Sequence, residues 1–252
     1  ESPVLKLAQA LREKKLYEEI DGLGYKKRNE FFYNPQKTFV NLDEAPEVPY
    51  NLVNIENYIE NYSFATGKPG RNIAFYTSRG CPHRCGFCYN KEFNKRKWRG
   101  ESSDHLVGRM EELVKKYNIT AFEIEDDEFF VDMNRARKVC ELLLDKKLNI
   151  EIFTTCRVNY VMQRMDDGLL KLCFDAGFKS LAFGVESGSP RVQQLMAKDI
   201  SNDQVIGTIE RLKKAGIGSK YYFIAGTPTE TPEDLYATTD LIRKMKQIDY
   251  GV

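Results

Sequence analysis

The stretch that decides the fold is Ser78-Arg79-Gly80-Cys81-Pro82-His83-Arg84-Cys85-Gly86-Phe87-Cys88-Tyr89-Asn90. It follows a short apolar run at residues 73–76, which is typical of a buried strand. A glycine and a proline then break the run into a loop. The loop carries Cys81, Cys85 and Cys88 in the spacing Cys-x3-Cys-x2-Cys, so the sequence places three thiols just beyond the end of a strand.

Three cysteines this close together favour metal ligation over a disulfide, which would leave one thiol unpaired. Iron–sulfur clusters are held by cysteine thiolates, normally four for a cubane. Three ligands would leave the fourth iron open to a substrate or cofactor, and an open position distinguishes catalytic metal sites from structural ones. The alternative is a structural zinc site completed by His83 or His105. It is disfavoured because His83 lies inside the loop and a second Cys/His pair is absent.

Composition indicates a globular chain. Its 252 residues, 42% of them hydrophobic, are enough to bury one sizeable core. The net charge of +1 argues neither for nor against nucleic acid or a membrane surface. The sequence has no apolar run long enough for a membrane span and no signal-peptide core. Six cysteines, three of them scattered, fit a reducing compartment, so we expect a cytoplasmic protein.

From residue 73 onward the pattern alternates between strand and helix, which predicts an α/β fold with a parallel sheet covered by helices. The expected strands are Ile73–Ser78, Ala121–Glu125, Ile150–Thr155, Ser180–Val185 and Lys220–Ala225. The helices between them have clear start signals, at Ser102 or Ser103, Asp132, Asp166, Ser201 and Thr231. Five such units curl into a barrel or form an open doubly wound sheet.

The first 70 residues show a different pattern. An apolar stripe predicts a helix from Ser2 to about Tyr17, and a hairpin-like stretch follows around Lys26–Asn34. Asn41–Pro49 is expected to be an extended linker, and Asn51–Tyr62 a short helix that leads into the first strand.

The cysteine spacing, with Phe87 just before the last cysteine, resembles the signature of the radical S-adenosylmethionine (SAM) enzymes. The resemblance implies a 4Fe–4S cluster held by Cys81, Cys85 and Cys88, whose open iron chelates SAM. It implies reductive cleavage of SAM to a 5′-deoxyadenosyl radical. It also decides the fold class, because this family uses a partial, TIM-like (β/α)6 barrel. About five complete βα units are expected here, with a sixth strand beginning near Tyr250, where the sequence stops.

The resemblance also implies cofactor-binding residues after each strand. Asp126 or Asp127 matches the position that meets the SAM amino group, and a carboxylate suits an ammonium there. Arg157 matches an arginine that would meet the cofactor's carboxylate, with a surface salt bridge as the alternative. Phe87 belongs to the cluster motif itself. Glu123 and Glu128, by contrast, are expected in a solvated acidic turn.

The fourth and fifth strands end in two further family-like motifs. Gly184-Val185-Glu186-Ser187-Gly188-Ser189 would bring Glu186 and Ser187 to the ribose and methionyl groups. Lys198 would neutralise the cofactor's carboxylate, with an ordinary surface lysine as the alternative. Gly226-Thr227-Pro228-Thr229 would flank the adenine through backbone at Gly226 and Pro228. The family usually has glycine where Thr229 stands, so we expect a less permissive turn there. Cys140, Cys156 and Cys173 are expected to be buried core residues.

The leading segment resembles the connection found in the cobalamin-binding subgroup. Residues 1–70 would then be a linker after a cobalamin-binding domain that this sequence lacks, and 71–252 a radical SAM barrel truncated at its C-terminus. This implies cobalamin-dependent methyl transfer, or ring rearrangement or cyclisation, at an unactivated carbon of a small molecule. One alternative is methylthio transfer to RNA or protein, although residues 1–70 contain no cysteine. Another is a non-catalytic metal-binding module.

The expected partners follow from that chemistry. A radical SAM enzyme needs a reducing electron donor such as flavodoxin or ferredoxin. Residues 91–99 hold five basic residues interleaved with Phe93 and Trp98, a composition that also suits RNA. A solvated loop beside the cluster is the preferred interpretation, because the rest of the chain is not basic enough to make a nucleic-acid surface.

Overall fold

The computed structural model describes residues 2–251. The chain divides after Glu47 into two compact units, residues 1–47 and 48–252. Residues 48–70 therefore group with the sheet-containing unit. Within the described residues, no helix combines the length and apolarity needed to cross a membrane.

The first unit is small. Helix α1 (Ser2–Arg12) is followed by a hairpin of β1 (Gly24–Lys27) and β2 (Glu30–Tyr33), and a 3-10 turn, η1 (Leu42–Glu44), comes last. The predicted hairpin is confirmed, and its two turn residues have positive φ, as tight hairpin turns require. The prediction that α1 reaches Tyr17 was wrong. Lys14 has φ +55°, a left-handed conformation that a helix cannot continue through.

The second unit contains a six-stranded sheet in the order β10-β9-β8-β7-β4-β3. Its five parallel strands are neighbours in chain order, as the sequence predicts. An unbroken chain order is typical of a curling barrel, whereas a doubly wound sheet reverses direction. The parallel strands are β4 (Pro69–Phe75), β7 (Ala121–Ile124), β8 (Glu151–Thr155), β9 (Phe178–Glu186) and β10 (Gly218–Phe223).

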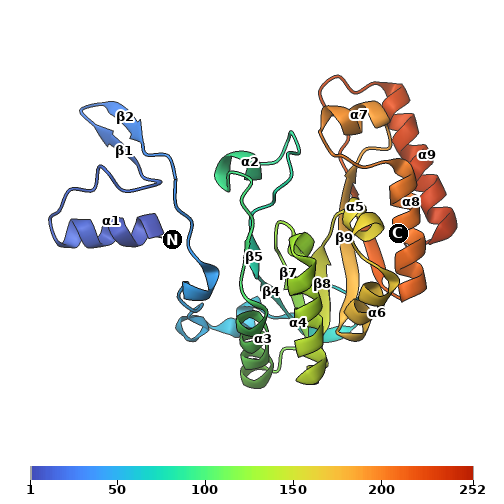
Figure 1. Cartoon of the computed structure of the whole chain (residues 1–252), viewed down its shortest axis with the longest axis horizontal. Helices are drawn as coiled ribbons and strands as arrows, with labels where there is room; N and C mark the ends of the chain where they lie inside the picture. Colours follow the sequence, from blue (N-terminus) through green and yellow to red (C-terminus); the bar gives the residue numbers. More distant parts are fainter. Residues whose placement is uncertain (1, 252) are drawn as a thin grey trace. The chain divides into compact units, whose positions relative to one another are not determined.

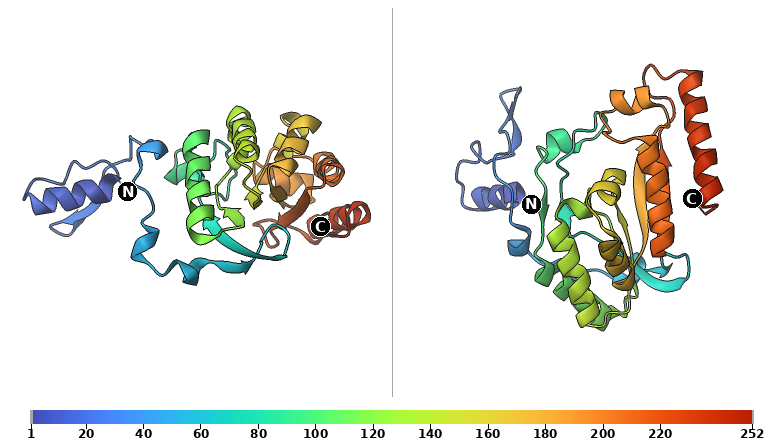
Figure 2. Two further views of the ribbon diagram at one scale, coloured as in Figure 1. Left: turned by 90° about the horizontal axis from the view of Figure 1, so that it is seen from below. Right: turned by 45° about the vertical axis from the view of Figure 1, so that its right-hand side comes forward.

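The crossover helices lie side by side along the outer face of this sheet, as Figures 1 and 2 show. Each helix packs on the next in the series. The result is a partial (β/α) barrel with five βα units in the described chain, which confirms the predicted fold class. The helices are α3 (Ser103–Tyr117), α4 (Met133–Asp145), α6 (Asp167–Asp175), α8 (Asn202–Ala215) and α9 (Pro232–Ile248).

The sixth strand of the sheet is not a sixth βα strand. It is β3 (Glu60–Tyr62), which pairs antiparallel with β4 at the edge of the sheet. The prediction of a helix over Asn51–Tyr62 was therefore wrong. Two 3-10 turns, η2 (Tyr50–Leu52) and η3 (Ile55–Tyr58), precede the strand instead.

Several short elements sit in the loops beyond the parallel strands. β5 (Ser78–Arg79) pairs antiparallel with β6 (Arg99–Gly100), so the first predicted strand breaks before Ser78. The pattern did not predict α5 or α7. The short helical elements are α2 (Asn90–Phe93), η4 (Phe129–Val131), α5 (Val158–Gln163) and α7 (Pro190–Leu195).

Local capping explains why the helices begin where the sequence indicates. Ser201 and Thr231 each form a complete capping box, and their side chains accept hydrogen bonds from the amides of Gln204 and Asp234. Ser102, Asp132 and Asp166 cap α3, α4 and α6 through their side chains. These bonds satisfy backbone donors that have no partner inside the helix.

The sheet buries one face against the helices. Ile73, Phe122 and Ile152 lie in the hydrophobic core, at most 4% exposed. The other face carries Glu123 and Lys220, and the Lys220 Nζ stands 4.7 Å from the centre of the Phe153 ring. Polar side chains on the inner face of a half-barrel leave room for a polar ligand rather than a packed core.

Gly177, which ends α6, offers a test of this packing. Its φ is +112°, and an added Cβ would lie 2.3 Å from the Ile150 carbonyl oxygen. We expect Gly177→Ala to lower the free energy of unfolding by about 3 kcal/mol, measured by urea denaturation. The matched control is Gly108→Ala inside α3, where an added Cβ meets nothing within 4 Å. That variant should gain about 0.5–1 kcal/mol, and equal losses in both would contradict the packing described.

Candidate metal centre and cofactor site

The cysteine loop (residues 81–88) is anchored through Thr77 and Ser78, just before it begins. The Asp126 carboxylate, at the end of β7, accepts hydrogen bonds from the amides of both residues at 2.7 and 2.9 Å. It also accepts bonds from both hydroxyls, at 2.5 and 2.6 Å. Asp126 is only 3% exposed. This buried carboxylate therefore fixes the path by which the chain leaves β4.

A buried arginine completes this network. Arg135 of α4 donates to the carbonyl oxygen of Thr77 at 3.0 Å and to its hydroxyl oxygen at 2.9 Å. The Thr77 hydroxyl accepts from the guanidinium, so its own proton is directed to Asp126. Burial raises the pKa of Asp126, while the hydrogen bonds from Ser78 and Thr77 oppose that shift.

All three loop cysteines are free thiols. Cys85 is buried, and Cys81 and Cys88 are partly buried. Burial raises the pKa of Cys81 to about 11, so the bare site holds it as a thiol, and metal binding would have to displace the proton. Arg157 Nη1 donates to Cys85 Sγ at 3.4 Å, which links the third parallel strand's loop to the cysteine loop.

The donors that the cysteine loop offers to a metal are its three thiols. In the described part of the chain, no group of three or more His, Cys, Asp or Glu side chains is arranged to hold one metal ion. The two candidate histidines have other contacts: His83 Nε2 lies 2.7 Å from the Tyr160 hydroxyl, and His105 Nδ1 lies 3.4 Å from Glu101 Oε2. A cluster needs each thiolate on a different iron, so its three ligands do not converge on one point.

Four of the predicted cofactor residues gather beside this loop. The Lys198 Nζ lies 2.9 Å from Glu186 Oε1, and both side chains are 9% exposed. Arg157 Nη2 donates to the Lys198 carbonyl oxygen at 2.5 Å. The Lys198 Nζ also stands 5.6 Å from the centre of the Phe87 ring. The structure thus brings Cys85, Phe87, Arg157, Glu186 and Lys198 together.

The backbone around this cluster is tightly constrained. Glu186 has φ +69°, a costly conformation for a residue with a side chain. An added Cβ at Gly184 would lie 2.3 Å from Glu186 Oε1, so the ends of the two paired side chains would have to shift. The Gly86 amide donates to the Met196 carbonyl oxygen at 2.8 Å, which ties the cysteine loop to the end of α7.

Asp127 lies next to the same loop. Its carboxylate accepts from the Gly80 amide at 2.8 Å and from the Tyr89 hydroxyl at 2.9 Å. Burial and this bond to Asp127 raise the pKa of Tyr89 to about 12. Asp127 is only partly buried, so each of its oxygens keeps room for a further hydrogen bond.

The remaining predicted residues do not share contacts with this group. The Ser187 hydroxyl lies 3.2 Å from that of Thr238 on α9. Gly226 and Pro228 lie in an exposed loop, where the Gly226 amide donates to Glu230 Oε2 at 2.5 Å. Thr229 has φ +70°, so the strained turn expected at this threonine is present.

Glu128 does not lie in a solvated turn. The prediction was wrong, because Glu128 is only 2% exposed. Its carboxylate accepts one hydrogen bond, from the Phe130 amide at 3.1 Å. Burial raises the pKa of Glu128 to about 8. Phe129 and Phe130, both fully buried, follow it directly and were the available signal that the turn points into the core.

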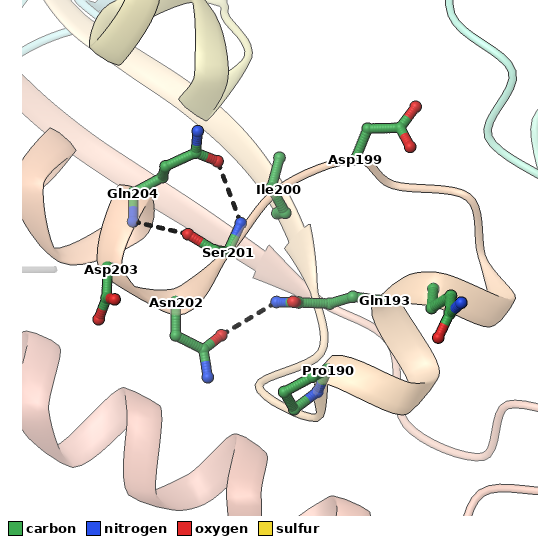
Figure 3. Close-up of a pocket in the computed structure, with 9 residues that line it drawn as sticks. Pro190, Gln193, Asp199, Ile200, Ser201, Asn202, Asp203 and Gln204 are labelled. Carbon is green, nitrogen blue, oxygen red and sulfur yellow. Dashed lines mark hydrogen bonds between the residues drawn. The ribbon is translucent and has the colours of Figure 1, made fainter.

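A pocket of about 540 Å³ lies between α7 and α8. Figure 3 shows the hydrogen bonds along it, from Gln193 Nε2 to Asn202 Oδ1 at 3.0 Å, from the Ser201 amide to Gln204 Oε1 at 3.1 Å and from the Gln204 amide to the Ser201 hydroxyl at 3.3 Å. None of the predicted cofactor residues lines it. It borders that region, because Asp199, which lines it, pairs with Arg84 of the cysteine loop at 3.5 Å.

Residues 75–242 match the profile of the radical SAM superfamily. This match covers well over half of the chain and includes the cysteine loop and the loops that follow the other parallel strands. The chain therefore belongs to the radical SAM superfamily, as the cysteine spacing predicts. That family uses a 4Fe–4S cluster and SAM.

Two curated relatives have methyltransferase names. An uncharacterized methyltransferase of Pyrococcus horikoshii is 32% identical over 247 residues, which cover 97% of this chain and 51% of the relative. The cytidylyl-2-hydroxyethylphosphonate methyltransferase of Streptomyces wedmorensis is 29% identical over 208 residues, covering 79% of this chain and 38% of the relative. The chain thus spans about half the length of the first relative and less of the second.

Two solved structures share the fold. The cobalamin-dependent radical SAM enzyme OxsB, with aqua-cobalamin and SAM bound, matches with a TM-score of 0.79 at 22% identity, covering 95% of this chain and 34% of OxsB. The radical SAM methyltransferase TsrM of Kitasatospora setae, with cobalamin and a 4Fe–4S cluster, matches with a TM-score of 0.73 at 17% identity. That match covers 97% of this chain and 48% of TsrM.

The Asp126 network predicts a large stability difference between the two adjacent acids. Asp126→Asn keeps one acceptor oxygen but turns an amide group toward buried donors. We expect it to lower the free energy of unfolding by about 3 kcal/mol. The control, Asp127→Asn, is partly buried and should lose about 1 kcal/mol. Urea denaturation of the cluster-free chains measures both, and equal losses would contradict the anchoring role of Asp126.

The raised pKa of Glu128 predicts that the free energy of unfolding depends on pH. Its folded pKa of about 8 exceeds the unfolded value of about 4.3, so the folded chain binds more protons between these pH values. The stabilisation that the neutral Glu128 carboxyl contributes is fully present below about pH 4 and is lost as the pH rises through about 8. Glu128→Gln should therefore match the wild type near pH 5 and exceed it by about 1 kcal/mol or more at pH 8. The free energy of unfolding is measured by urea denaturation at each pH. A constant difference between the variant and the wild type across this pH range would contradict a buried neutral carboxyl at Glu128.

Proposed function

We propose that this chain is the catalytic barrel of a radical SAM enzyme, with Cys81, Cys85 and Cys88 as the ligands of a 4Fe–4S cluster. The observation that carries the proposal is the fixed loop of three free thiols beside the buried Lys198–Glu186 ion pair. When bound, the cluster and SAM supply one-electron cleavage of SAM to a 5′-deoxyadenosyl radical. The protein contributes binding, orientation and exclusion of water.

The Lys198–Glu186 pair supports binding of the amino-acid part of SAM. That part is a zwitterion, with an ammonium and a carboxylate, and this ion pair presents both complementary charges in one place. Buried ion pairs lose much of their solvation, so a ligand that extends the charge network restores favourable contacts. We propose that Lys198 meets the cofactor's carboxylate and that Glu186 lies beside the methionyl and ribose groups.

We propose different roles for the adjacent carboxylates of Asp126 and Asp127. Asp126 already accepts four hydrogen bonds from Thr77 and Ser78, so we assign it the positioning of the loop. Asp127 is partly exposed and keeps acceptor capacity, which favours it for the SAM amino group. Arg157 contacts both Cys85 and Lys198, and we propose that it holds the loop against the cofactor site. Phe87 would cover one side of Lys198.

Ser187, Gly226 and Pro228 remain proposed cofactor contacts on the strength of their motifs. Ser187 lies directly after Glu186, and Gly226 and Pro228 follow the last parallel strand, β10. In a barrel, the loops after the strands converge on one mouth, which supports an adenosine site there.

The proposed overall reaction is cobalamin-dependent methyl transfer, or ring rearrangement or cyclisation, at an unactivated carbon of a small molecule. The methyltransferase names of two relatives support it, as does a 29% identical cyclase of Rubrivivax gelatinosus, the anaerobic magnesium-protoporphyrin IX monomethyl ester cyclase. Residues 1–70 would link this barrel, 71–252, to a cobalamin-binding domain. The described cysteines are free thiols, which supports a reducing, cytoplasmic setting.

Methylthio transfer to RNA or protein is the second candidate. A putative methylthiotransferase of Methanocaldococcus jannaschii is 27% identical over 235 residues. Residues 1–70 contain no cysteine to hold a second cluster, which favours the first candidate. Adding cobalamin to the assay distinguishes the two, because methylthio transfer does not require it.

Anaerobic reconstitution with iron and sulfide tests the assignment of the ligands. The full chain should bind about four irons and release 5′-deoxyadenosine from SAM under dithionite, measured by iron analysis and chromatography. Replacing Cys81, Cys85 and Cys88 with alanine should abolish both signals. The matched control replaces Cys140, Cys156 and Cys173, which are buried and distant in sequence from the loop. Iron retained in the first variant, or lost in the second, would overturn the assignment.

A further inference from the structure

The basic turn (residues 91–99) is the strongest concentration of positive charge that the proposed chemistry has not yet used. It holds five basic residues and one acid, Glu92, in a chain whose net charge is only +1. The side chains of Lys91 and Lys95 are 63% and 41% exposed and lie 4.0 and 3.7 Å from Glu92. Exposed pairs at such distances contribute little, so the turn keeps a positive surface.

This turn is attached to the cysteine loop. The Arg96 Nε donates to the Pro82 carbonyl oxygen, next to Cys81, at 3.1 Å. A Cβ on Gly80 would lie 2.2 Å from the Lys97 carbonyl oxygen, so the two segments are in close backbone contact. After the turn, β6 pairs with β5, which directly precedes the loop. The turn therefore packs against the start of the cysteine loop.

The backbone of the turn is held in an unusual shape. Lys95 and Arg96 have φ of +51° and +57°, two consecutive left-handed residues that both carry side chains. Each such residue costs free energy and persists only where the surroundings enforce it. The Arg96 and Lys97 amides are bonded to the carbonyl oxygens of Asn90 and Asn94, which brace the turn. Its charges are consequently presented in a fixed arrangement.

Two aromatic side chains lie at the entrance to the same turn. Phe93 is 66% exposed and Tyr89 is 60% exposed, and their ring centres are 5.9 Å apart. Exposed aromatic residues surrounded by basic ones have the composition of a protein interface, with apolar anchors and a charged rim. Figure 1 shows α2, which carries Phe93, at the end of the sheet where the cysteine loop lies.

We propose that the basic turn, with Phe93 and Tyr89, is the docking surface for a small acidic electron-transfer protein that reduces the cluster. The proposal rests on the radical SAM function proposed above. The step moves one electron: the reduced carrier of the donor is oxidised by one electron, the cluster is reduced by one, and no bond forms or breaks. Acidic donors fit by charge complementarity, which steers encounter and raises association rates.

A protein donor explains the position of the turn better than RNA does. The surface begins at Tyr89, directly after Cys88, and so lies next to the proposed cluster ligands in the chain. RNA recognition needs a longer basic groove with several stacking platforms along it. Phe93 and Tyr89 form one compact pair instead, which suits a single protein contact.

The test uses the reconstituted full chain and an acidic flavodoxin in its hydroquinone form as the probe. We expect Lys91→Glu with Lys95→Glu to slow flavodoxin-driven cluster reduction about tenfold or more at low salt and to weaken flavodoxin binding. The salt dependence of the rate should become shallower. Iron content and dithionite-driven reduction, followed by absorbance, should match the wild type. The control, Lys138→Glu with Lys244→Glu on exposed positions of α4 and α9, should leave both rates unchanged.

Three results would overturn the proposal. The first is a wild-type flavodoxin rate in the Lys91→Glu, Lys95→Glu variant. The second is an equal loss with dithionite, which would make the turn a structural support for the cluster. The third is unchanged flavodoxin binding together with lost binding of a single-stranded RNA probe, which would make it an RNA surface. Failure of the radical SAM function itself is distinguishable, because dithionite would then reduce no cluster in the wild type.

Discussion

The structure depends on one buried carboxylate. Asp126 lies at the end of β7 yet determines the course of the chain after β4, because it satisfies the amides and hydroxyls of Thr77 and Ser78. A buried charge is tolerated only when it is fully hydrogen-bonded. Arg135 of α4 supplies the compensating charge through Thr77. Two strands and a helix thus meet at the start of the cysteine loop, whose position is set by the barrel rather than by the loop itself.

The opposite side of the loop is held by a second charged group. Gly86 bonds to Met196, and Arg157 spans from Cys85 to the Lys198 carbonyl oxygen. The cysteine loop and the end of α7 are therefore linked by backbone and guanidinium contacts. This arrangement places the Cys85 thiol and the Lys198–Glu186 pair in one polar region, which suits the proposed binding of a zwitterionic cofactor. A preorganised polar site avoids the cost of rearranging dipoles during the reaction.

Much of the barrel could be predicted because the sequence patterns that mark its helices and strands span only a few adjacent residues. Helix starts depend on a cap and the few residues after it, so Ser201 and Thr231 are readable from the chain. The five parallel strands are short apolar runs between such helices. The cysteine triplet needs only its own spacing to be noticed. Thr229 is similar: a threonine in place of glycine predicts strain, and its φ is +70°.

The errors have nonlocal causes. β3 forms because β4 offers an unpaired edge, which no property of residues 51–62 reveals. Glu128 is buried because the two residues that follow it, Phe129 and Phe130, pack into the core. The division of tasks between Asp126 and Asp127 depends on Thr77 and Ser78, nearly fifty positions away along the chain. Such pairings follow from the assembled partial barrel and cannot be obtained from adjacent residues alone.

The central claim is that the anchored loop holds a cluster with one iron open to SAM. The most direct measurement is the electron paramagnetic resonance spectrum of the reconstituted, reduced chain before and after SAM is added. A cofactor that binds the open iron must change the spectrum, and the account predicts a clear shift in the g-values. An unchanged spectrum at saturating SAM would contradict it.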